Sequence, residues 1–367
     1  MLRRFARALG GRKTSSSSKR SRASALERDD DGTTTRSVSK ASLVELGALE
    51  RCAVVRRPSA RNASPYVADV ERGETKTIAI AHAPNLDSGG KFRAGAEVLC
   101  SRQPGVDANT LGTRGKPKCE LVTRLLRCEE RENAALGGVW VSAHPSLVEK
   151  IAKGLIEGGA LDARLHGSPV ERDGVSAQTT MKRRKTESAS NNYRPDFALN
   201  HKDGSRTILE VKQVVDTDYS REFVEERARL QAPHPVYSPS GSAPYARAGI
   251  FPWGKRGQKG PDGEKVVSAR AIEHLRELTE LAKDPNVHPV ILFICSRADV
   301  EGFRPNGAAC PSFAKYLELA QHAGVRILVQ KVCWGEGEDL GKAFDAGPLP
   351  IWPALGEGDE FKCSENR

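Results

Sequence analysis

The sequence lacks the long apolar runs, the cysteine motifs and the aromatic clusters that would assign it to several common classes of protein. No apolar run approaches the roughly 18 residues that a transmembrane helix needs, so we expect no membrane partner. The eight cysteines include no Cys-x-x-Cys pair and follow no secretory signal, which argues against a zinc site and a disulfide framework. Aromatic residues make up 5% of the chain and are scattered, so they predict no platform for stacking nucleic-acid bases.

The positive charge of the chain is concentrated at its N-terminus. The formal net charge is +10, yet residues 1–26 contain eight Lys or Arg and no acidic residue. The rest of the chain therefore carries only about +2, and bulk charge gives little support to nucleic-acid binding by the folded part.

The N-terminal 45 residues are predicted to be a disordered, basic targeting segment. Residues 1–9 can form a short basic amphipathic helix, and a Ser- and Arg-rich stretch follows. This composition is typical of a transit peptide, so we expect delivery to an organelle, either a plastid or a mitochondrion. A disordered basic tail without an address is the alternative. A nuclear signal at residues 182–185 is a weaker one, because a basic run is more often a solvated loop.

Residues 46–135 are predicted to form a small β-barrel domain. Gly and Pro clusters separate short runs that favour strands. These runs are residues 52–56, 66–70, 77–81, 97–100 and 120–126. Five short strands in about 80 residues suggest an OB-like barrel.

Residues 136–335 are predicted to form a second domain with a mixed sheet and packed helices, of the α+β or α/β class. A strand is expected at residues 139–141, and a helix begins at Ser146 with Glu149 completing a capping box. Two further helices and two apolar strands are expected later in this domain. They are helices 269–283 and 312–323 and strands 289–295 and 325–332. Residues 231–264 are predicted to be an insertion, and residues 336–367 a partly ordered tail.

The most informative motif lies in two short runs of the second domain. Asp196 lies in the run Arg-Pro-Asp-Phe, and the next run places Glu210 two residues before Lys212. Asp203-Gly204 between the runs suits a tight hairpin turn, and Glu210 and Lys212 point to the same face of a strand. Two carboxylates can hold a divalent metal and a lysine can orient a phosphate or a water, which is the chemistry of metal-dependent phosphodiester cleavage.

A solvent-exposed strand offers a simpler explanation of the same motif. Glu74 and Lys76 repeat the Glu-x-Lys pattern with no partner acid. The apolar residues on both sides of Glu210 favour a buried strand instead, where an unpaired charge is costly. Glu187 is the first candidate for a third acid, and Glu149 is its rival, although helix capping accounts for Glu149.

Most of the chain resembles the sugar fermentation stimulation protein A family. The resembling stretches include Tyr-Arg-Pro-Asp-Phe-Ala-Leu at 193–199, Leu-Glu-Val-Lys at 209–212, Ile-Phe-Pro at 250–252, and residues 268–278, 290–305 and 323–325. In the first half they are residues 66–70, 81–85, 95–101 and 140–161. The resemblance is collinear over roughly residues 50–335.

The resemblance implies an OB-like barrel followed by a PD-(D/E)xK nuclease-like domain, and a DNA-binding protein linked to sugar utilisation genes. It assigns Asp196, Glu210 and Lys212 to the nuclease motif. It also implies phosphate contacts or support of the sheet edge for a further set of residues. These are Arg194, Arg270, His274, Arg297 and Asp299.

The sequence departs from the family in three regions. Leu86-Asp87 follow Pro-Asn where the family has Thr-Gly, the segment around Glu187 is rewritten and basic, and the loop 231–261 is longer. With the basic N-terminus, these differences suggest a eukaryotic, organelle-targeted relative.

The leading hypothesis is a DNA-binding protein with a Mg²⁺- or Mn²⁺-dependent nuclease site. Asp196, Glu210 and the Val211 carbonyl would hold the metal, with Glu187 as a candidate further ligand, and Lys212 would act on the attacking water. The alternative is a non-catalytic DNA- or RNA-binding regulator on the same scaffold. A third hypothesis, an enzyme acting on a small phosphate compound, lacks a Gly-rich phosphate loop. DNA is preferred to RNA as the predicted partner, and the oligomeric state is left open.

Overall fold

The computed structural model describes most of the chain after residue 40. The described ranges are 41–85, 88–112, 115–130, 137–165, 169–177, 181–182, 192–229, 235–240, 244–356 and 358–361. The predicted targeting helix therefore lies outside the described residues, as do Glu187 and most of the basic run at 182–185.

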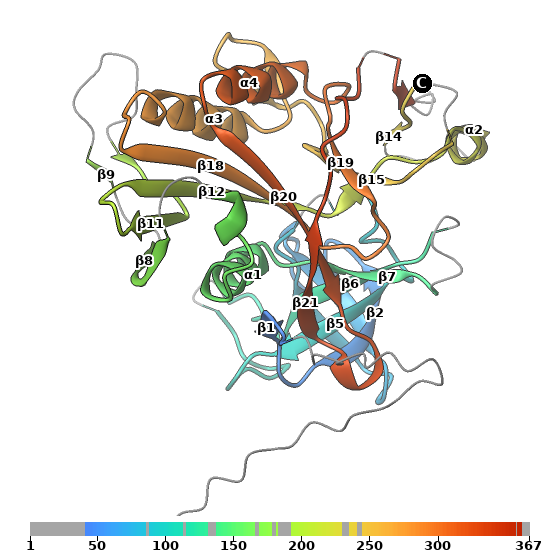
Figure 1. Cartoon of the computed structure of the whole chain (residues 1–367). Coiled ribbons are helices and arrows are strands. Elements are labelled where there is room, and N and C mark those ends of the chain that lie inside the picture. The colour runs from blue at the N-terminus through green and yellow to red at the C-terminus, as the bar shows by residue number, and fades with distance from the viewer. Residues whose placement is uncertain are drawn as a thin grey trace, which may run out of the picture. The chain divides into compact units, whose positions relative to one another are not determined.

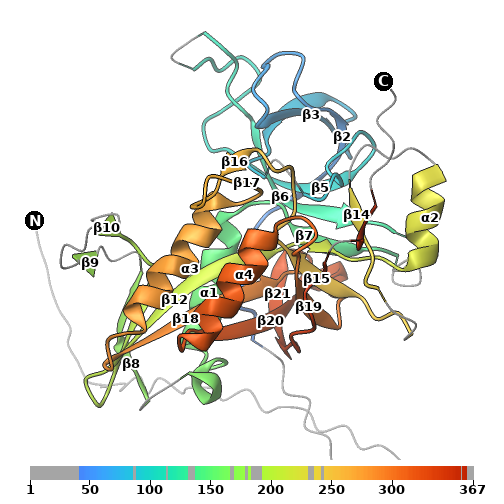
Figure 2. The ribbon, with the colours of Figure 1, turned by 90° about the horizontal axis from the view of Figure 1, so that it is seen from above.

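The first part of the described chain is a five-stranded barrel. Its strands are β2 (Glu50–Arg56), β3 (Val67–Arg72), β4 (Ile78–His82), β5 (Glu97–Arg102) and β6 (Leu121–Cys128). Their order in the sheet is β4-β3-β2-β5-β6, and a parallel pairing of Ala81 with Leu121 closes the ring. Figure 2 shows β2, β3 and β5 curving around it. The five strands predicted from the sequence are confirmed.

The barrel continues directly into the rest of the chain. Strand β7 (Val139–Ser142) pairs with β6 through Cys128 and Val139, so the predicted strand at 139–141 extends the barrel sheet. Helix α1 (Ser146–Glu157) follows at once, as predicted. The predicted capping box is wrong, because the Ser146 hydroxyl contacts His144 Nδ1 at 2.8 Å and makes no cap bond.

A seven-stranded mixed sheet forms the second part, in the order β1-β21-β20-β18-β12-β11-β8. Its strands are β1 (Val44–Glu45), β8 (Val170–Ala177), β11 (Phe197–His201), β12 (Arg206–Val214), β18 (Val287–Cys295), β20 (Arg326–Trp334) and β21 (Lys342–Pro348). The central strands β12, β18 and β20 are parallel, and the outer pairs are antiparallel. Parallel strands buried on both faces need continuous apolar runs, and β18 carries one.

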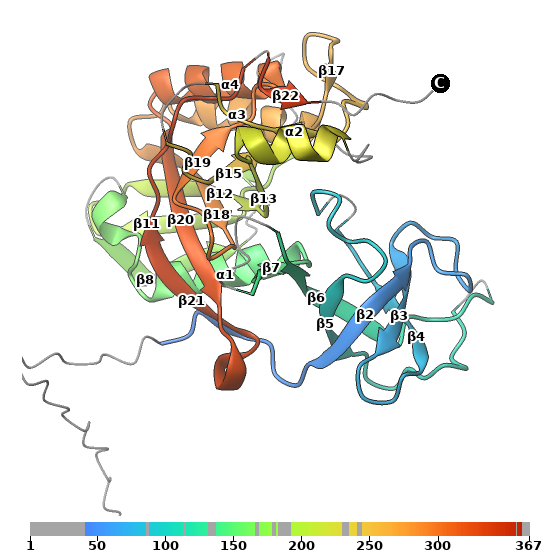
Figure 3. The same ribbon diagram turned by 90° about the vertical axis from the view of Figure 1, so that its right-hand side faces the viewer.

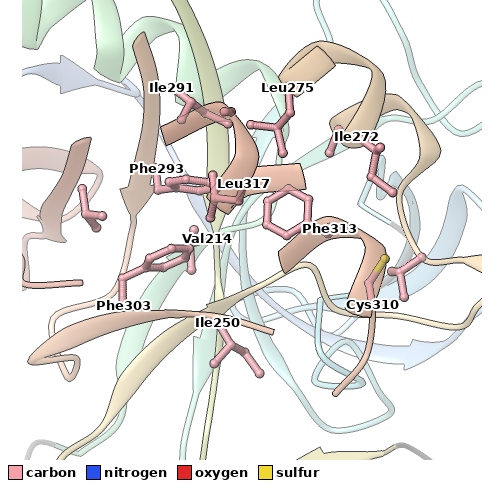
Figure 4. Close-up of a cluster of buried hydrophobic side chains, with 14 of the residues drawn as sticks. Val214, Ile250, Ile272, Leu275, Ile291, Phe293, Phe303, Cys310, Phe313 and Leu317 are labelled. Carbon is pink, nitrogen blue, oxygen red and sulfur yellow. The ribbon is translucent and has the colours of Figure 1, made fainter. Parts of the chain in front are cut away.

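Helices cover both faces of this sheet. Helices α3 (Ala269–Leu281) and α4 (Pro311–His322) pack on one face, seen above the sheet in Figure 1, and α1 packs on the other. Figure 4 shows Phe293 of β18 against Phe303 and Phe313 in the core under α4. The rings of Phe293 and Phe303 stack with centroids 4.5 Å apart.

Two segments predicted as irregular contribute strands. The insertion 231–264 contains β14 (Val236–Tyr237), β15 (Ala248–Phe251) and β16 (Gln258–Lys259), the last pairing with β17 (Lys265–Val266). Strand β15 lies between β13 (Asp216–Thr217) and β19 (Gly302–Pro305), in a three-stranded sheet beside the main core (Figure 3). The tail 336–367 supplies β21 to the main sheet and β22 (Glu360–Phe361) to β14. β21 pairs locally with β20 and at long range with β1, and β22 pairs at long range with β14. The Gly- and Pro-rich composition of the tail conceals these strands.

The remaining elements are short. They are helix α2 (Arg221–Arg229), β9 (Met181–Lys182), β10 (Asn192–Tyr193), and the 3-10 turns at Asp162–Arg164 and Gly337–Asp339. Across the described ranges, no helix is both long enough and apolar enough to pass through a membrane.

Candidate functional site

The predicted hairpin is formed by β11 and β12. Gly204 has a φ of 82°, a conformation that favours glycine, and the carboxylate of Asp203 accepts the Ser205 N–H at 3.0 Å to fix the turn. The antiparallel register pairs Phe197 with Leu209, so Asp196 lies opposite Glu210 just beyond the last ladder pair. Local turn chemistry therefore brings together two acids that are 14 residues apart in sequence.

Asp196 is half-buried at the point where β11 begins. Its Oδ2 accepts the backbone N–H of Val211 at 2.8 Å, which orients the carboxylate along the end of β12. Burial, and next the charge of Glu210, raise the pKa of Asp196, although the Val211 N–H and Lys212 oppose the shift. The raised pKa therefore reflects first the burial of Asp196 and second its repulsion by the neighbouring carboxylate of Glu210.

Glu210 is the most enclosed acid of the site, with 1% of its surface exposed. Its Oε2 accepts the Tyr193 hydroxyl at 3.1 Å, and its Oε1 contacts Lys212 Nζ at 2.5 Å and His274 Nδ1. Burial raises the pKa of Glu210, but hydrogen bonding to His274 and the charge of Lys212 outweigh it and leave the pKa below its ordinary value. Glu210 is therefore held as a carboxylate.

The tautomer of His274 follows from its neighbours. Arg270 Nε can only donate, and it lies 3.2 Å from His274 Nε2, so Nε2 accepts. The ring proton is then on Nδ1, the atom that faces Glu210 Oε1. Two of the residues implied by the family resemblance, Arg270 and His274, thus extend from the acidic pair to the exposed side of α3.

Sequence reasoning missed two buried members of this cluster, Tyr193 and Glu277. The Tyr193 ring meets the His274 ring edge-on at a centroid distance of 5.7 Å. Burial, and next the charge of Glu210, raise the pKa of Tyr193. The hydroxyl therefore stays protonated and donates a hydrogen bond to Glu210. Glu277 is buried one turn after His274 on α3. The four- and three-residue spacings from Arg270 to His274 to Glu277 were the available signal, because they place the three on one helix face.

The other predicted site residues are placed as follows. Arg194 is exposed two residues before Asp196, while the Val211 side chain is buried and its N–H is bonded to Asp196. Glu149 sits in the first turn of α1, and its charge adds to the raised pKa of Asp196. Among the described residues, no group of three or more His, Cys, Asp or Glu side chains is arranged to hold a metal ion.

Arg297 has a structural position that corrects its predicted role as a nucleic-acid contact. Its side chain is 0% exposed. Nε and Nη2 bind the two carboxylate oxygens of Asp299 at 2.8 and 2.7 Å, and Nη2 also reaches Glu130 at 3.1 Å. Arg247 pairs with the same two acids. We assign Arg297 to a buried ion network, because a phosphate cannot reach it in this arrangement.

Comparison with known proteins shows similarity to one family. Residues 261–338, from the end of the insertion through β20, match the model of the "Sugar fermentation stimulation protein RE domain". Three curated relatives are each described as a "Sugar fermentation stimulation protein homolog". Over these stretches the chain is similar to the sugar fermentation stimulation protein family.

These relatives come from bacteria and an archaeon and match only part of the chain. The protein of Jannaschia sp. is 33% identical over 88 residues, covering 24% of this chain and 34% of the relative. That of Methanobrevibacter smithii is 38% identical over 74 residues, covering 19% and 30%. That of Thermosynechococcus vestitus is 30% identical over 111 residues, covering 29% and 43%. The alignments thus span less than half of each relative.

The fold is shared over a larger part of the chain. SfsA of Pyrococcus furiosus, solved in complex with Ca²⁺, superposes with a TM-score of 0.54 at 19% identity and covers 85% of this chain and 99% of its own. The predicted fold class, an OB-like barrel followed by a nuclease-like mixed sheet, is confirmed.

Proposed function

We propose that this protein binds DNA and cleaves phosphodiester bonds with the help of a divalent metal at the hairpin site. The observation that carries the proposal is the convergence of Asp196, Glu210 and Lys212 at the end of one hairpin, with Lys212 Nζ 2.5 Å from Glu210 Oε1. A buried Glu–Lys pair facing a second carboxylate is expensive as a purely structural device, and it matches the groups that metal-dependent phosphodiesterases use.

The acidic pair suits Mg²⁺ or Mn²⁺. The mutual repulsion that raises the pKa of Asp196 would be relieved by a cation shared with Glu210. Magnesium is commonly held by one or two carboxylates with waters and substrate phosphate oxygens completing its shell, so a third acidic side chain is not required. When bound, such a metal activates a water and offsets charge on the phosphate. The Ca²⁺ bound by the Pyrococcus protein supports a divalent ion in this fold.

The protein groups around the acids have separate tasks in this proposal. Lys212, fixed by Glu210, orients the attacking water and stabilises negative charge that develops on the phosphate. Tyr193 and His274 each contact one oxygen of Glu210 and hold its carboxylate in place. Arg194 and Arg270 are exposed beside the site and contact the phosphate backbone of the substrate.

A non-catalytic nucleic-acid-binding protein is the second candidate. Glu210 already has a lysine, a histidine and a tyrosine as partners, and these could neutralise the carboxylate without any metal. In that case the triad stabilises the hairpin and the protein acts by occupying DNA or RNA.

Metal binding distinguishes the two candidates. We expect Mn²⁺ at about a hundredfold its dissociation constant to stabilise the protein by about 2–3 kcal/mol, seen as a rise in the thermal unfolding midpoint. Asp196→Asn should abolish the rise, because it removes a charged ligand while keeping an oxygen for the Val211 N–H. Glu74→Gln, on an exposed turn of the barrel, is the matched control and should respond as the wild type does. Equal stabilisation of Asp196→Asn would place the metal elsewhere.

Cleavage assays then identify the substrate. Labelled single- and double-stranded DNA and RNA are incubated with the full chain and Mg²⁺ or Mn²⁺, with and without chelator. Metal-dependent cleavage of DNA is the expected result. Salt-sensitive binding that is indifferent to chelator, with no cleavage of any substrate, would support the second candidate.

A further inference from the structure

A second cluster of polar and basic side chains lies where the barrel passes into α1. Three strands of the barrel and the first turns of α1 each supply members. They are His82 of β4, Ser101 of β5, Arg124 of β6, His144 after β7, and Ser146 and Lys150 of α1. The parallel pairing of β4 with β6, His82 opposite Val122, and the hydrogen bond from the Ala143 N–H to the Arg124 carbonyl bring these segments together.

The two histidines of this cluster face each other. Their rings meet at a centroid distance of 6.4 Å and an interplanar angle of 75°. The backbone N–H of Ser146 can only donate, and it lies 3.3 Å from His144 Nδ1. His144 Nδ1 is therefore an acceptor, so the ring carries its proton on Nε2 and keeps a donor there for another group.

The cluster has positive charge without a compensating acid. Arg124 is half-buried, and its Nε donates to the Ser101 hydroxyl at 2.8 Å. Within the described chain neither Arg124 nor Lys150 forms an ion pair with a carboxylate. Burial lowers the pKa of Arg124, and burial followed by the charge of Arg124 lowers the pKa of His144 to about 4. A half-buried guanidinium without a counterion, beside two imidazoles and two hydroxyls, is suited to receive an anion.

This cluster is connected to the candidate metal site. Lys150 follows Glu149, whose negative charge contributes to the raised pKa of Asp196. The side chain of Gln213, next to Lys212, donates to the Ser142 carbonyl at 2.9 Å, two residues before His144. The first turn of α1 therefore lies between the two groups of residues.

We propose that the Arg124–His144 cluster is a phosphate-binding site. It holds one backbone phosphate of the nucleic acid while a neighbouring phosphodiester bond lies at Asp196 and Glu210. The assignment of the phosphate to a nucleic acid rests on the proposed function, whereas the anion site itself does not. Arg124 supplies a paired donor to the phosphate oxygens, and His144 Nε2 and Lys150 are the further donors. Ser146 holds the His144 ring through Nδ1.

The test measures binding with cleavage suppressed. Anisotropy of a labelled DNA oligonucleotide is followed in chelator against salt concentration, for the full-length wild type, Arg124→Gln and His144→Gln. Arg102→Gln is the matched control, since Arg102 adjoins Ser101 on β5 but is 75% exposed and paired with Glu50. We expect Arg124→Gln to weaken binding roughly tenfold and to reduce the salt slope by about 1, and Arg102→Gln to do neither.

A second arm separates the sources of phosphate. Thermal unfolding is followed in sodium phosphate and in chloride of equal ionic strength, and unfolding in chloride alone checks that each variant folds. Stabilisation by phosphate that is lost in Arg124→Gln, with DNA binding unchanged, would support an anion site that serves a small phosphate compound. Variants indistinguishable from the wild type in both arms would overturn the site. That result would leave the metal-dependent cleavage proposed above untouched, because it is assayed at Asp196 and Glu210.

Discussion

Lys212→Ala is expected to reduce metal-dependent cleavage by about 10²–10⁴-fold, the usual effect of losing a positioned proton-transfer or charge-stabilising group. The ammonium group lies 2.5 Å from Glu210 Oε1 and 3.3 Å from His274 Nδ1, and alanine puts no cation in its place. Initial rates at saturating metal measure the loss. The fold should survive, because Glu210 keeps Tyr193 and His274 as partners.

The control for this prediction lies on the same hairpin. Lys202 is exposed at the turn, so Lys202→Ala removes the same charge without touching Glu210 and should keep the wild-type rate. DNA affinity in chelator should change little in either variant. A Lys212→Ala rate within a few fold of the wild type would remove Lys212 from the mechanism and favour a purely structural pairing with Glu210.

Arg297→Ala is expected to lower the free energy of unfolding by about 3–5 kcal/mol, because it removes one of the two arginines that neutralise the buried carboxylates of Asp299 and Glu130. Arg297 binds both oxygens of Asp299, one oxygen of Glu130 and the Val215 carbonyl at 2.9 Å. Denaturant unfolding measures the change. Arg51→Ala is the contrast: Arg51 also pairs with a glutamate, Glu97, but its side chain is 51% exposed, so the expected cost is below about 1 kcal/mol.

The pH dependence of stability offers an independent check of the same network. Burial raises the pKa of Glu130, but the charges of Lys91, Arg297 and Arg247 outweigh it and lower the pKa to about 2. A carboxyl with a depressed folded-state pKa contributes stability above its unfolded pKa and loses it as the pH falls toward the folded value. The wild type should therefore lose this contribution between about pH 4.5 and 2, and Arg297→Ala should lose less there. Equal losses would show that the network does not control Glu130.

The parts of the fold that depend on local sequence could be predicted. The hairpin required only Asp203-Gly204 between two apolar runs, and the register then fixed Asp196 opposite Glu210. The five barrel strands and helices α1, α3 and α4 followed from periodicity and from Gly and Pro boundaries in the same way.

The parts that depend on distant partners could not be predicted. Burial of Glu210 by Tyr193 and His274 joins segments 17 and 64 residues away from it. The burial of Arg297 could not be foreseen, because its network includes Glu130, 167 residues away in sequence, as well as the nearby Asp299. Composition alone predicts that a charged side chain is exposed to solvent. This prediction fails where tertiary contacts supply a residue of opposite charge.

The short strand β1 makes the ends of the described chain depend on each other. Val44 pairs with Ala343 of β21, and Leu43 donates to the same residue at 2.7 Å while packing with Leu46 and Leu49 against the core beneath α1. A fragment that begins after residue 45, or one that stops near residue 335, would strip an edge from the seven-stranded sheet and expose unpaired backbone groups. Shortened forms of this protein should therefore keep both segments. Without them, aggregation through the exposed sheet edge would be mistaken for an effect of the hairpin site.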